Sequence, residues 1–253
     1  MFDLTGKTIV VTGSCRGIGL AIARALHGQG ANVVITARQP AQYPDVLAAF
    51  AAAPERVRLV SCDITSPESV AALFETALAW QGTLYGCVAN AGSRGSGQAV
   101  CDMDWDAWQA HVGANLHGTF ATLQHAAQHL CRQGEGGRLM AVSSLSAVKG
   151  TAGFADYGAG KAAITSLCRS LALELAASAI TVNSVLPGWV ETEMNRDVLA
   201  DRRQYESIRR LRIPLGRWAT PEDIAPLAVY LMSEESRYHT GDVITVDGGY
   251  RIF

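Results

Sequence analysis

The sequence lacks several features that mark secreted, metal-binding and membrane proteins. Its six cysteines are scattered, with no Cys-x-x-Cys pair and no spacing typical of zinc ligands, at positions 15, 62, 87, 101, 131 and 168. No apolar run approaches the ~18 residues of a membrane-spanning helix, and residues 1–7 lack the apolar core of a signal peptide. We therefore expect a cytoplasmic protein with reduced thiols, no bound metal and no membrane contact.

An excess of charge of one sign is also missing. The 253-residue chain has a formal net charge of −2, and 17% of its residues are charged. This balance argues against a general nucleic-acid binder and against a protein of anionic membrane surfaces. Internal repeats, low-complexity tracts and linkers are absent, while 49% apolar residues suffice for a sizeable core. We expect one domain over residues 1–253.

What the chain does contain is a regular alternation of strand-like and helix-like segments. The expected strands are short and apolar: Lys7–Val11, Asn32–Ala37, Arg56–Ser61, Leu84–Ala89, Arg138–Val142, Ile180–Leu186 and Asp242–Asp247. Helical patterns cover Leu20–Leu26, Pro40–Ala53, Pro67–Trp80, Asp104–Cys131, Tyr157–Leu175 and Pro221–Ser233. The alternation predicts the α/β class, with a single doubly wound (Rossmann) parallel sheet of about seven strands and helices on both faces. Such sheets bind ligands beyond the carboxyl ends of their strands.

A glycine-rich turn joins the first expected strand to the first helix. It reads Thr12-Gly-Ser-Cys-Arg-Gly-Ile-Gly19. A strand, a glycine turn and a helix together bring backbone N–H groups and a positive helix end to a pyrophosphate. The spacing differs from the commoner Gly-x-Gly-x-x-Gly. A tight turn with a purely structural role is the alternative.

The end of the second strand bears on the choice of dinucleotide. Enzymes that use NAD place an acidic residue there for the ribose hydroxyls, whereas an arginine suits the 2′-phosphate of NADP. This chain has Ala37 and Arg38 and no acid, and it adds Arg16 in the glycine turn. We expect NADP(H) to be preferred, with NAD(H) possible. Two solvent-facing arginines are the alternative.

Tyr157 and Lys161 stand four residues apart at the start of a helical pattern, with Ser144 upstream. The spacing puts both side chains on one helix face. A phenol ionises near ~10, and a neighbouring ammonium lowers such a pKa by ~1–3 units. The pair could therefore exchange a proton with a substrate alcohol or carbonyl. An ordinary tyrosine and lysine on an amphipathic helix are the alternative.

Several polar or glycine residues fall at the expected carboxyl ends of strands: Gly13, Arg38, Asp63, Asn90, Ser144 and Pro187. Their common edge favours one binding site.

The segment from Glu191 to Arg212 has six arginines and five acids in an amphipathic pattern and follows a strand end. A substrate lid around residues 188–212 is expected there. A solvated charged face explains its arginines, and contact with an anionic substrate or carrier is the alternative. Four histidines (111, 117, 125 and 129) lack a metal-site pattern.

Taken together, these motifs resemble the short-chain dehydrogenase/reductase family over essentially the whole chain. The glycine turn resembles its cofactor loop, and Asn90-Ala91-Gly92 resembles its fourth-strand motif. Asn115, Ser144, Tyr157 and Lys161 match the family's catalytic tetrad in order and spacing. Ala89 stands where a second Asn is common, and Gly158 and Gly160 replace small or hydroxyl residues. Each helix-interior glycine costs ~1 kcal/mol, which predicts a looser first turn.

The resemblance implies roles for these residues. Tyr157 would act as general acid or base, Lys161 would lower its pKa and bind the nicotinamide ribose, and Ser144 would hold the substrate oxygen. Asn115 would hold a water that connects Lys161 to solvent. The implied cofactor-binding residues, besides Tyr157 and Lys161, are Gly13, Ser14, Arg16, Gly17, Ile18, Gly19, Arg38, Asp63, Ile64, Asn90, Ala91, Gly92, Pro187, Gly188, Val190 and Thr192.

We accordingly expect an NADP(H)-dependent oxidoreductase that acts on a carbonyl or secondary alcohol, similar to 3-oxoacyl-carrier-protein reductase-like members. An NAD(H)-dependent alcohol or polyol dehydrogenase, a non-enzymatic dinucleotide sensor and, less favoured, a SAM-dependent methyltransferase are the alternatives. The family implies a homotetramer. The helices from Asp104 and Tyr157 support this, because apolar residues spread around Ala162–Ala177 beyond one face.

Overall fold

Seven parallel strands form one sheet in the order β3-β2-β1-β4-β5-β6-β7 in the computed structural model, which describes residues 1–253. The strands are β1 (Thr8–Val11), β2 (Asn32–Ala37), β3 (Val57–Ser61), β4 (Gly86–Ala89), β5 (Gly137–Val142), β6 (Ile180–Pro187) and β7 (Val243–Val246). Each lies within two residues of its expected bounds. The expected fold class, a doubly wound parallel sheet with flanking helices, is confirmed.

The strand order reverses between β1 and β4, which pair in parallel from Ile9 opposite Gly86 to Val11 opposite Val88. Chain connections leave this point in opposite directions, so a crevice opens beyond the carboxyl ends of the two strands. The glycine turn follows β1, and Asn90 follows β4. The two motifs therefore meet at the place where such sheets bind dinucleotides.

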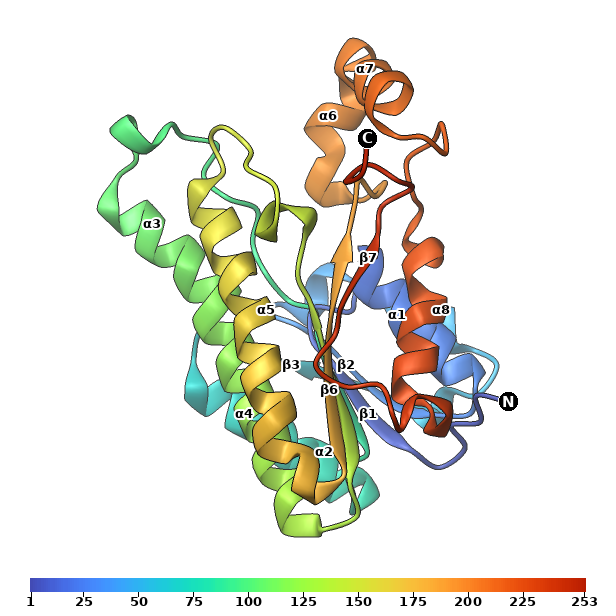
Figure 1. The fold of residues 1–253 in the computed structure, drawn as a ribbon. Helices are drawn as coiled ribbons and strands as arrows, with labels where there is room; N and C mark the ends of the chain where they lie inside the picture. The colour runs from blue at the N-terminus through green and yellow to red at the C-terminus, as the bar shows by residue number, and fades with distance from the viewer.

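Helices cover both faces of the sheet (Figure 1). On one face, α1 (Gly17–Gly28) and α8 (Pro221–Met232) pack on β1, β4 and β5 around Ile22, Val88 and Ile224. On the other, α2 (Pro67–Gln81), α4 (Gly118–Gln133) and α5 (Ala155–Leu175) enclose a core that includes Phe74, Leu123 and Ile164. Because both faces are covered, β1 and β4 are buried throughout. Their near-continuous apolar sequences follow from this double burial.

Residues Pro40–Ala53 do not form the expected helix. They form the 3₁₀ turns η1 (Pro40–Gln42) and η2 (Val46–Phe50), and η3 (Pro54–Arg56) follows. Pro44 lies in the middle, lacks an N–H, and disfavours helical backbone at the residue before it. Phe50 is buried edge-on against His27 of α1, with ring centroids 5.2 Å apart. The packing of this aromatic side chain overrides the helix propensity of the alanines.

The expected helix Asp104–Cys131 is divided by a π-helical segment. α3 (Trp105–Val112) passes into η5 (Gly113–His117), which has π-helical hydrogen bonding, and then into α4. Asn115 lies at the centre of η5 and is fully buried. Its side-chain amide donates to the backbone oxygens of Ser93 and His111, both at 3.0 Å. The wider turn accompanies this inward side chain, as π segments often do near functional sites.

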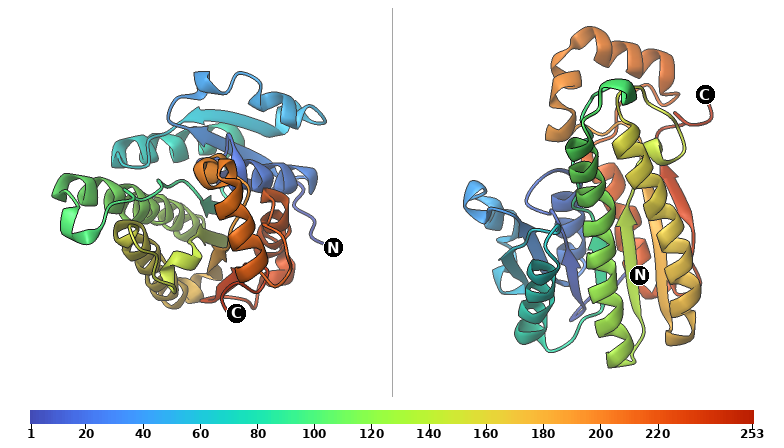
Figure 2. Two further views of the ribbon diagram at one scale, coloured as in Figure 1. Left: turned by 90° about the horizontal axis from the view of Figure 1, so that it is seen from above. Right: turned by 90° about the vertical axis from the view of Figure 1, so that its left-hand side faces the viewer.

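The amphipathic segment expected over Glu191–Arg212 lies between β6 and α8 and forms three short helical elements. It contains η8 (Glu193–Asn195), α6 (Arg196–Ala200) and α7 (Arg202–Arg212). Asp201 separates the last two, because its carboxylate caps α7 by accepting from the N–H groups of Arg203 and Gln204. Figures 1 and 2 show α6 and α7 (orange) beyond the end of the sheet to which β6 leads.

Short 3₁₀ turns complete the chain: η4 (Val100–Asp102), η6 (Leu145–Ala147), η7 (Ala176–Ser178) and η9 (Glu234–Ser236). The two proline-marked helix starts follow their sequence signals. Ser66 caps α2 by accepting from the N–H of Ser69 at 3.1 Å, and Thr220 and Asp223 form a capping box on α8. None of the helices combines the length and apolar character needed to cross a membrane.

Candidate active site

The glycine turn after β1 leaves no space for side chains on its inner side. Gly13 has φ +61°, and a Cβ there would lie 2.9 Å from the Cα of Ala91. A Cβ on Gly19 would lie 2.5 Å from the carbonyl oxygen of Gly13 and would also collide with the Asn90 amide. Gly17, with φ +54°, occupies the left-handed region that favours glycine. The backbone therefore forms a close-packed cradle beside the β1–β4 crevice.

The amino end of α1 completes this cradle. Its N-cap residue, Arg16, makes no side-chain hydrogen bond to the helix, and no acidic residue lies in the first turn. The first backbone N–H groups of a helix lack intrahelical partners and carry partial positive charge. A cradle without Cβ atoms at an uncapped helix N-terminus fits the pyrophosphate of a dinucleotide.

The residues around the cradle hold it in place by hydrogen bonds. Thr12 Oγ1 accepts from the N–H groups of Asn90 and Ala91, both at 3.1 Å. The Asn90 amide donates to the carbonyl oxygens of Thr12 (2.9 Å) and Gly13 (3.0 Å). Ser14 is fully buried, where its hydroxyl donates to the Val11 oxygen at 2.6 Å. The side chains of Asn90 and Ser14 therefore position the turn, and only their backbones remain for a ligand.

The hollow beside the ends of β2 and β3 suits the adenosine half. It measures about 670 Å³ and is lined by Arg38, Thr65, Ser93, Gln109, Ala110, His111, Gly113 and Ala114. Asp63 Oδ1 accepts from the hydroxyl (2.7 Å) and the N–H (2.9 Å) of Thr65. These bonds, with the nearby Arg38 charge, lower the pKa of the Asp63 carboxyl. Arg38 itself is exposed, whereas Ile64 is nearly buried against Gly118.

Tyr157 and Lys161 lie one turn apart near the start of α5, with the Lys161 Nζ 5.7 Å from the centre of the phenol ring. The ammonium donates to the Val142 oxygen at the end of β5 at 2.9 Å. The Ser143 hydroxyl in turn donates to the Lys161 oxygen at 2.7 Å. These two bonds fix α5 on the end of β5, which is the strand end that carries Ser144.

The expected lowering of the Tyr157 pKa by Lys161 is not found. Burial raises the pKa of Tyr157, and a hydrogen bond with Ser144 acts in the opposite direction. Burial also lowers the pKa of Lys161 to about 8. Burial therefore stabilises the neutral phenol of Tyr157 relative to its phenolate, and the neutral amine of Lys161 relative to its ammonium. Ser144 N-caps η6 by accepting from the N–H of Ser146 at 3.1 Å.

Asn115 and Lys161 come together at Gly92. A Cβ on Gly92 would lie 2.7 Å from Asn115 Oδ1 and 3.4 Å from Lys161 Nζ. A Cβ on Gly160 would lie 3.1 Å from the Asn115 Cβ. Gly160 thus has a packing reason, because its missing side chain lets α5 approach η5. The four expected catalytic residues lie around one small region at the sheet end.

The expected contacts of the nicotinamide end follow β6. Gly188 passes close to β7, where a Cβ would lie 2.8 Å from the Asp247 Cα, and Thr192 lies against Gly17, 3.5 Å from a Cβ position there. Val190 is different. Its side chain is buried in the core, and its carbonyl accepts from the Asn195 amide at 2.8 Å.

The sequence patterns did not single out three further ties between the loops of this region. Asp156, fully buried, accepts from the N–H of Tyr157 at 2.7 Å and of Ser96 at 2.8 Å, which joins the Ser93–Gly97 loop to α5. Arg94 of that loop binds Asp197 of α6 at 2.8 Å. Arg16 of the glycine turn forms an ion pair with Glu193 of η8. Of these three contacts, only that of Asp156 had a local signal in the sequence, because an acidic residue directly precedes Tyr157.

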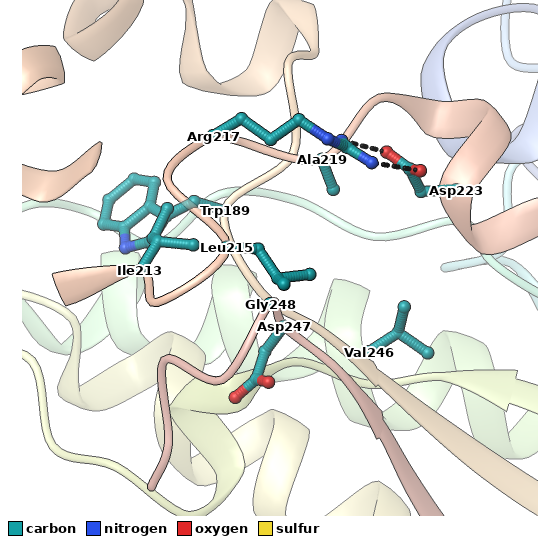
Figure 3. Close-up of a pocket in the computed structure, with 9 residues that line it drawn as sticks. All are labelled: Trp189, Ile213, Leu215, Arg217, Ala219, Asp223, Val246, Asp247 and Gly248. Carbon is teal, nitrogen blue, oxygen red and sulfur yellow. Dashed lines mark hydrogen bonds and ion pairs between the residues drawn. The ribbon is translucent and has the colours of Figure 1, made fainter. Parts of the chain in front are cut away.

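A separate cavity of about 150 Å³ lies between the carboxyl end of β7 and the segment that leads into α8 (Figure 3). Its lining residues are Trp189, Ile213, Leu215, Arg217, Ala219, Asp223, Val246, Asp247 and Gly248. Arg217 and Asp223 form a bidentate ion pair at 2.6 and 2.8 Å, which lowers the pKa of Asp223 to about 2. None of Asn115, Ser144, Tyr157 and Lys161 lines this cavity, so it is not the reaction site.

Comparison with known proteins decides the family. A family model described as "Enoyl-(Acyl carrier protein) reductase" matches residues 13–251. An L-rhamnose 1-dehydrogenase (NAD(P)(+)) from Sphingomonas sp. (strain SKA58) is 38% identical over 97% of this chain and 96% of its own length. A solved short-chain type dehydrogenase/reductase from Mycobacterium marinum is 36% identical, with a TM-score of 0.92, over 98% of this chain and 97% of its own. The chain belongs to the short-chain dehydrogenase/reductase family.

Membership confirms the resemblance and the oxidoreductase class that the motifs predicted. A second solved relative has a bound dinucleotide. It is a gluconate 5-dehydrogenase from Burkholderia cenocepacia J2315 in complex with NADP and tartrate. It is 29% identical to this chain, with a TM-score of 0.93, and the match covers 100% of this chain and 98% of the relative. A nicotinamide dinucleotide is therefore the cofactor class of this short-chain dehydrogenase/reductase, in agreement with the cradle after β1.

Proposed function

We propose that this short-chain dehydrogenase/reductase prefers NADP(H) and interconverts a carbonyl and a secondary alcohol through Asn115, Ser144, Tyr157 and Lys161. The observation that carries the proposal is their convergence. Ser144 acts on the phenol of Tyr157 and lowers its pKa against the effect of burial, Lys161 lies 5.7 Å from the same phenol ring, and Asn115 meets Lys161 at Gly92. A proton relay accounts for a buried lysine, a half-buried phenol and a serine hydroxyl that share one strand end.

The bound cofactor supplies or accepts the hydride. Tyr157 donates the proton to the substrate oxygen in reduction and removes it in oxidation. The Ser144 hydroxyl hydrogen-bonds that oxygen and stabilises its developing charge. Burial raises the pKa of Tyr157 above the ordinary phenol value, so the phenol is protonated at neutral pH and carries the proton that reduction requires.

Lys161 is proposed to hold the nicotinamide ribose and to supply Tyr157 with a new proton. With a pKa of about 8, its ammonium gives up a proton near working pH. Asn115 is proposed to hold the water that returns it. Its Nδ2 is taken by Ser93 and His111, but Oδ1 accepts only a long 3.3 Å bond from the Ser93 N–H. A carbonyl oxygen accepts two hydrogen bonds, so one position remains for water.

The preference for NADP(H) rests on Arg38, Ala37 and Arg16. Arg38 is exposed at the end of β2 and lines the hollow that suits adenosine. Ala37 offers no carboxylate to the ribose hydroxyls of NAD. An arginine binds phosphate through charge-assisted, bidentate hydrogen bonds. Bound NADP in the gluconate 5-dehydrogenase relative supports the same choice. The rhamnose dehydrogenase relative is named for both dinucleotides, which keeps NAD(H) as the second candidate.

We propose a sugar or sugar acid as the substrate, because one relative that is 38% identical to this chain is named for rhamnose and one that is 29% identical is named for gluconate.

Residues 1–253 are proposed to act as a single domain in which residues 188–212 form the substrate lid. The lid shares a small core with residues 213–218 that follow it: the Trp218 ring lies tilted against Trp189 at 4.7 Å and stacks on Tyr205 at 5.1 Å. Because this core is separate from the two cores that flank the sheet, the lid and residues 213–218 can move as one piece.

A cytoplasmic homotetramer is the proposed state of the protein. All six cysteines are free, which is typical of reducing compartments. Phe120 on α4 is 43% exposed and Leu173 on α5 is 83% exposed, although both helices already bury a face on the sheet. Exposed apolar side chains on the outer side of such helices favour a contact with another subunit.

The test is a turnover screen of the purified enzyme. NADP⁺ reduction is followed with L-rhamnose, gluconate and other polyols, and NADPH oxidation is followed with keto-sugars, 3-oxoacyl thioesters and steroid ketones. Turnover of a sugar or sugar acid that is lost in Tyr157→Phe supports the proposal. Tight dinucleotide binding without turnover of any carbonyl or alcohol would favour the sensor alternative.

A further inference from the structure

Arg16 already has a carboxylate partner, and this partner belongs to the lid. Its guanidinium forms an ion pair with Glu193, which lies 177 positions later in η8. We propose that Glu193 is a specificity-determining residue that competes with the 2′-phosphate of NADP for Arg16 and thereby limits the preference for NADP over NAD. This inference rests on the proposed function, in which Arg16 is a phosphate contact.

The backbone holds the two residues close together. Arg16 is the N-cap of α1 and directly precedes Gly17. Thr192, which directly precedes Glu193, is the N-cap of η8 and lies against Gly17. The two side chains are 59% and 53% exposed, so the ion pair lies at the surface of the crevice. A phosphate arriving from solvent can reach the guanidinium without moving a buried group.

The charges predict opposite consequences for the two dinucleotides. A 2′-phosphate carries about two negative charges, so it gains from Arg16 only when it displaces Glu193 or shares the guanidinium with a like charge. NAD has a neutral hydroxyl at this position and leaves the ion pair intact. Arg38 differs from Arg16, because it forms no ion pair. It therefore supplies a constant attraction for the phosphate, whereas the attraction of Arg16 depends on Glu193.

A second ion pair of the same segment provides a matched control. Asp197 of α6 binds Arg94 at 2.8 Å, and Arg94 belongs to the loop after β4, not to the glycine turn. Asp197→Asn and Glu193→Gln remove the same charge and each release one tie of the lid. Only Glu193→Gln releases Arg16. If a looser lid by itself changes cofactor affinity, both variants show the change. If the release of Arg16 changes the ratio of NADP⁺ to NAD⁺ affinity, only Glu193→Gln shows it.

The experiment measures dissociation constants for NADP⁺ and NAD⁺ by isothermal titration calorimetry, without substrate, in wild type, Glu193→Gln, Asp197→Asn, Arg16→Ala and the double variant Arg16→Ala/Glu193→Gln. We expect Glu193→Gln to raise the ratio of NADP⁺ to NAD⁺ affinity about fivefold, the scale of one exposed ion pair. Asp197→Asn should leave the ratio within twofold of wild type. In the Arg16→Ala background, Glu193→Gln should no longer change it, which is the signature of a coupled pair.

An unchanged ratio in Glu193→Gln, an equal shift in Asp197→Asn, or a shift that persists without Arg16 would each overturn the inference. These results leave the proposed NADP preference standing on Arg38. Conversely, a wild-type ratio near one that rises in Glu193→Gln supports the inference and contradicts the preference of the wild-type enzyme. The two proposals can therefore fail independently.

Discussion

The ammonium of Lys161 donates a 2.9 Å hydrogen bond to the backbone oxygen of Val142 in a site where the lysine is only 4% exposed. One bond to a neutral carbonyl does not replace the hydration of a buried charge. The pKa of Lys161 accordingly falls to about 8. In the proposed mechanism this lowered pKa serves proton transfer, and the folded state is expected to lose stability because of it.

Lys161→Met should therefore abolish turnover and stabilise the cofactor-free protein at pH 7. The folded pKa lies below the ordinary value of 10.5. Below pH 8 the lysine is charged in both states, so folding carries the whole cost of burying the charge. Between pH 8 and 10.5 only the unfolded chain keeps the proton, so wild-type stability rises with pH.

The gain for Lys161→Met should be up to about 3 kcal/mol at pH 7 and should shrink through this window. Urea unfolding of both proteins at pH 7, 8.5 and 10 checks this. A variant less stable than wild type at pH 7 would contradict a strained buried charge.

Tyr157→Phe should reduce turnover by ~10²–10⁴-fold, the usual contribution of general acid–base catalysis. The ring keeps its packing, and the phenol oxygen has no part in the cradle after β1. Cofactor dissociation constants should stay within twofold of wild type. Steady-state kinetics and cofactor titration measure the two effects. Turnover within a factor of a few of wild type would sink the proposed acid–base role.

Ala37→Asp should shift the enzyme toward NADH. The new carboxylate at the end of β2 repels a 2′-phosphate and accepts hydrogen bonds from ribose hydroxyls. Charged hydrogen bonds contribute ~1.5–3 kcal/mol, so we expect a change of ten- to hundredfold in the ratio of kcat/KM values. Kinetics with NADPH and NADH in wild type and variant provide the measurement. Equal wild-type values with no response to Ala37→Asp would show that Arg38 does not select the phosphate.

Gly19→Ala should destabilise the protein and weaken dinucleotide binding. Its Cβ would lie 2.5 Å from the Gly13 oxygen and would press on Asn90, so the cradle must move. Overpacking of this kind costs ~1–3 kcal/mol. Gly28→Ala is the matched control at the other end of α1, where nothing lies within 4 Å of an added Cβ. It should be neutral or stabilising by up to ~1 kcal/mol. Equal unfolding midpoints for the two variants would contradict the cradle geometry.

The sequence predicted those features that depend on short-range patterns. Each strand is a local apolar run, the cradle is a local glycine spacing, and Tyr157 and Lys161 are related by one helical turn. A parallel sheet then places every strand end on the same edge. For this reason the sheet, and the meeting of Asn115, Ser144, Tyr157 and Lys161, followed from the sequence.

Long-range side-chain pairing was not predictable in the same way. Arg16 and Glu193 are separated by 177 positions, and Arg94 and Asp197 by 103, so no periodicity relates them. The helix predicted for Pro40–Ala53 from its alanine content was wrong, because Pro44 and the buried Phe50 favour 3₁₀ turns in this segment. Similarly, the direction of the Tyr157 pKa depends on burial, which a spacing of four residues does not reveal.

The π-helical segment η5 also shows where this chain tolerates a change of length. In an α-helix each residue turns the following ones by about 100°, so a deletion normally rotates a buried face into solvent. A π turn contains one residue more than the α pattern requires. A single deletion within Gly113–His117 would restore a regular helix from α3 to α4. We expect the fold to absorb this shortening but Asn115 to turn away from Ser93, so the extra residue serves the proposed site and not the scaffold.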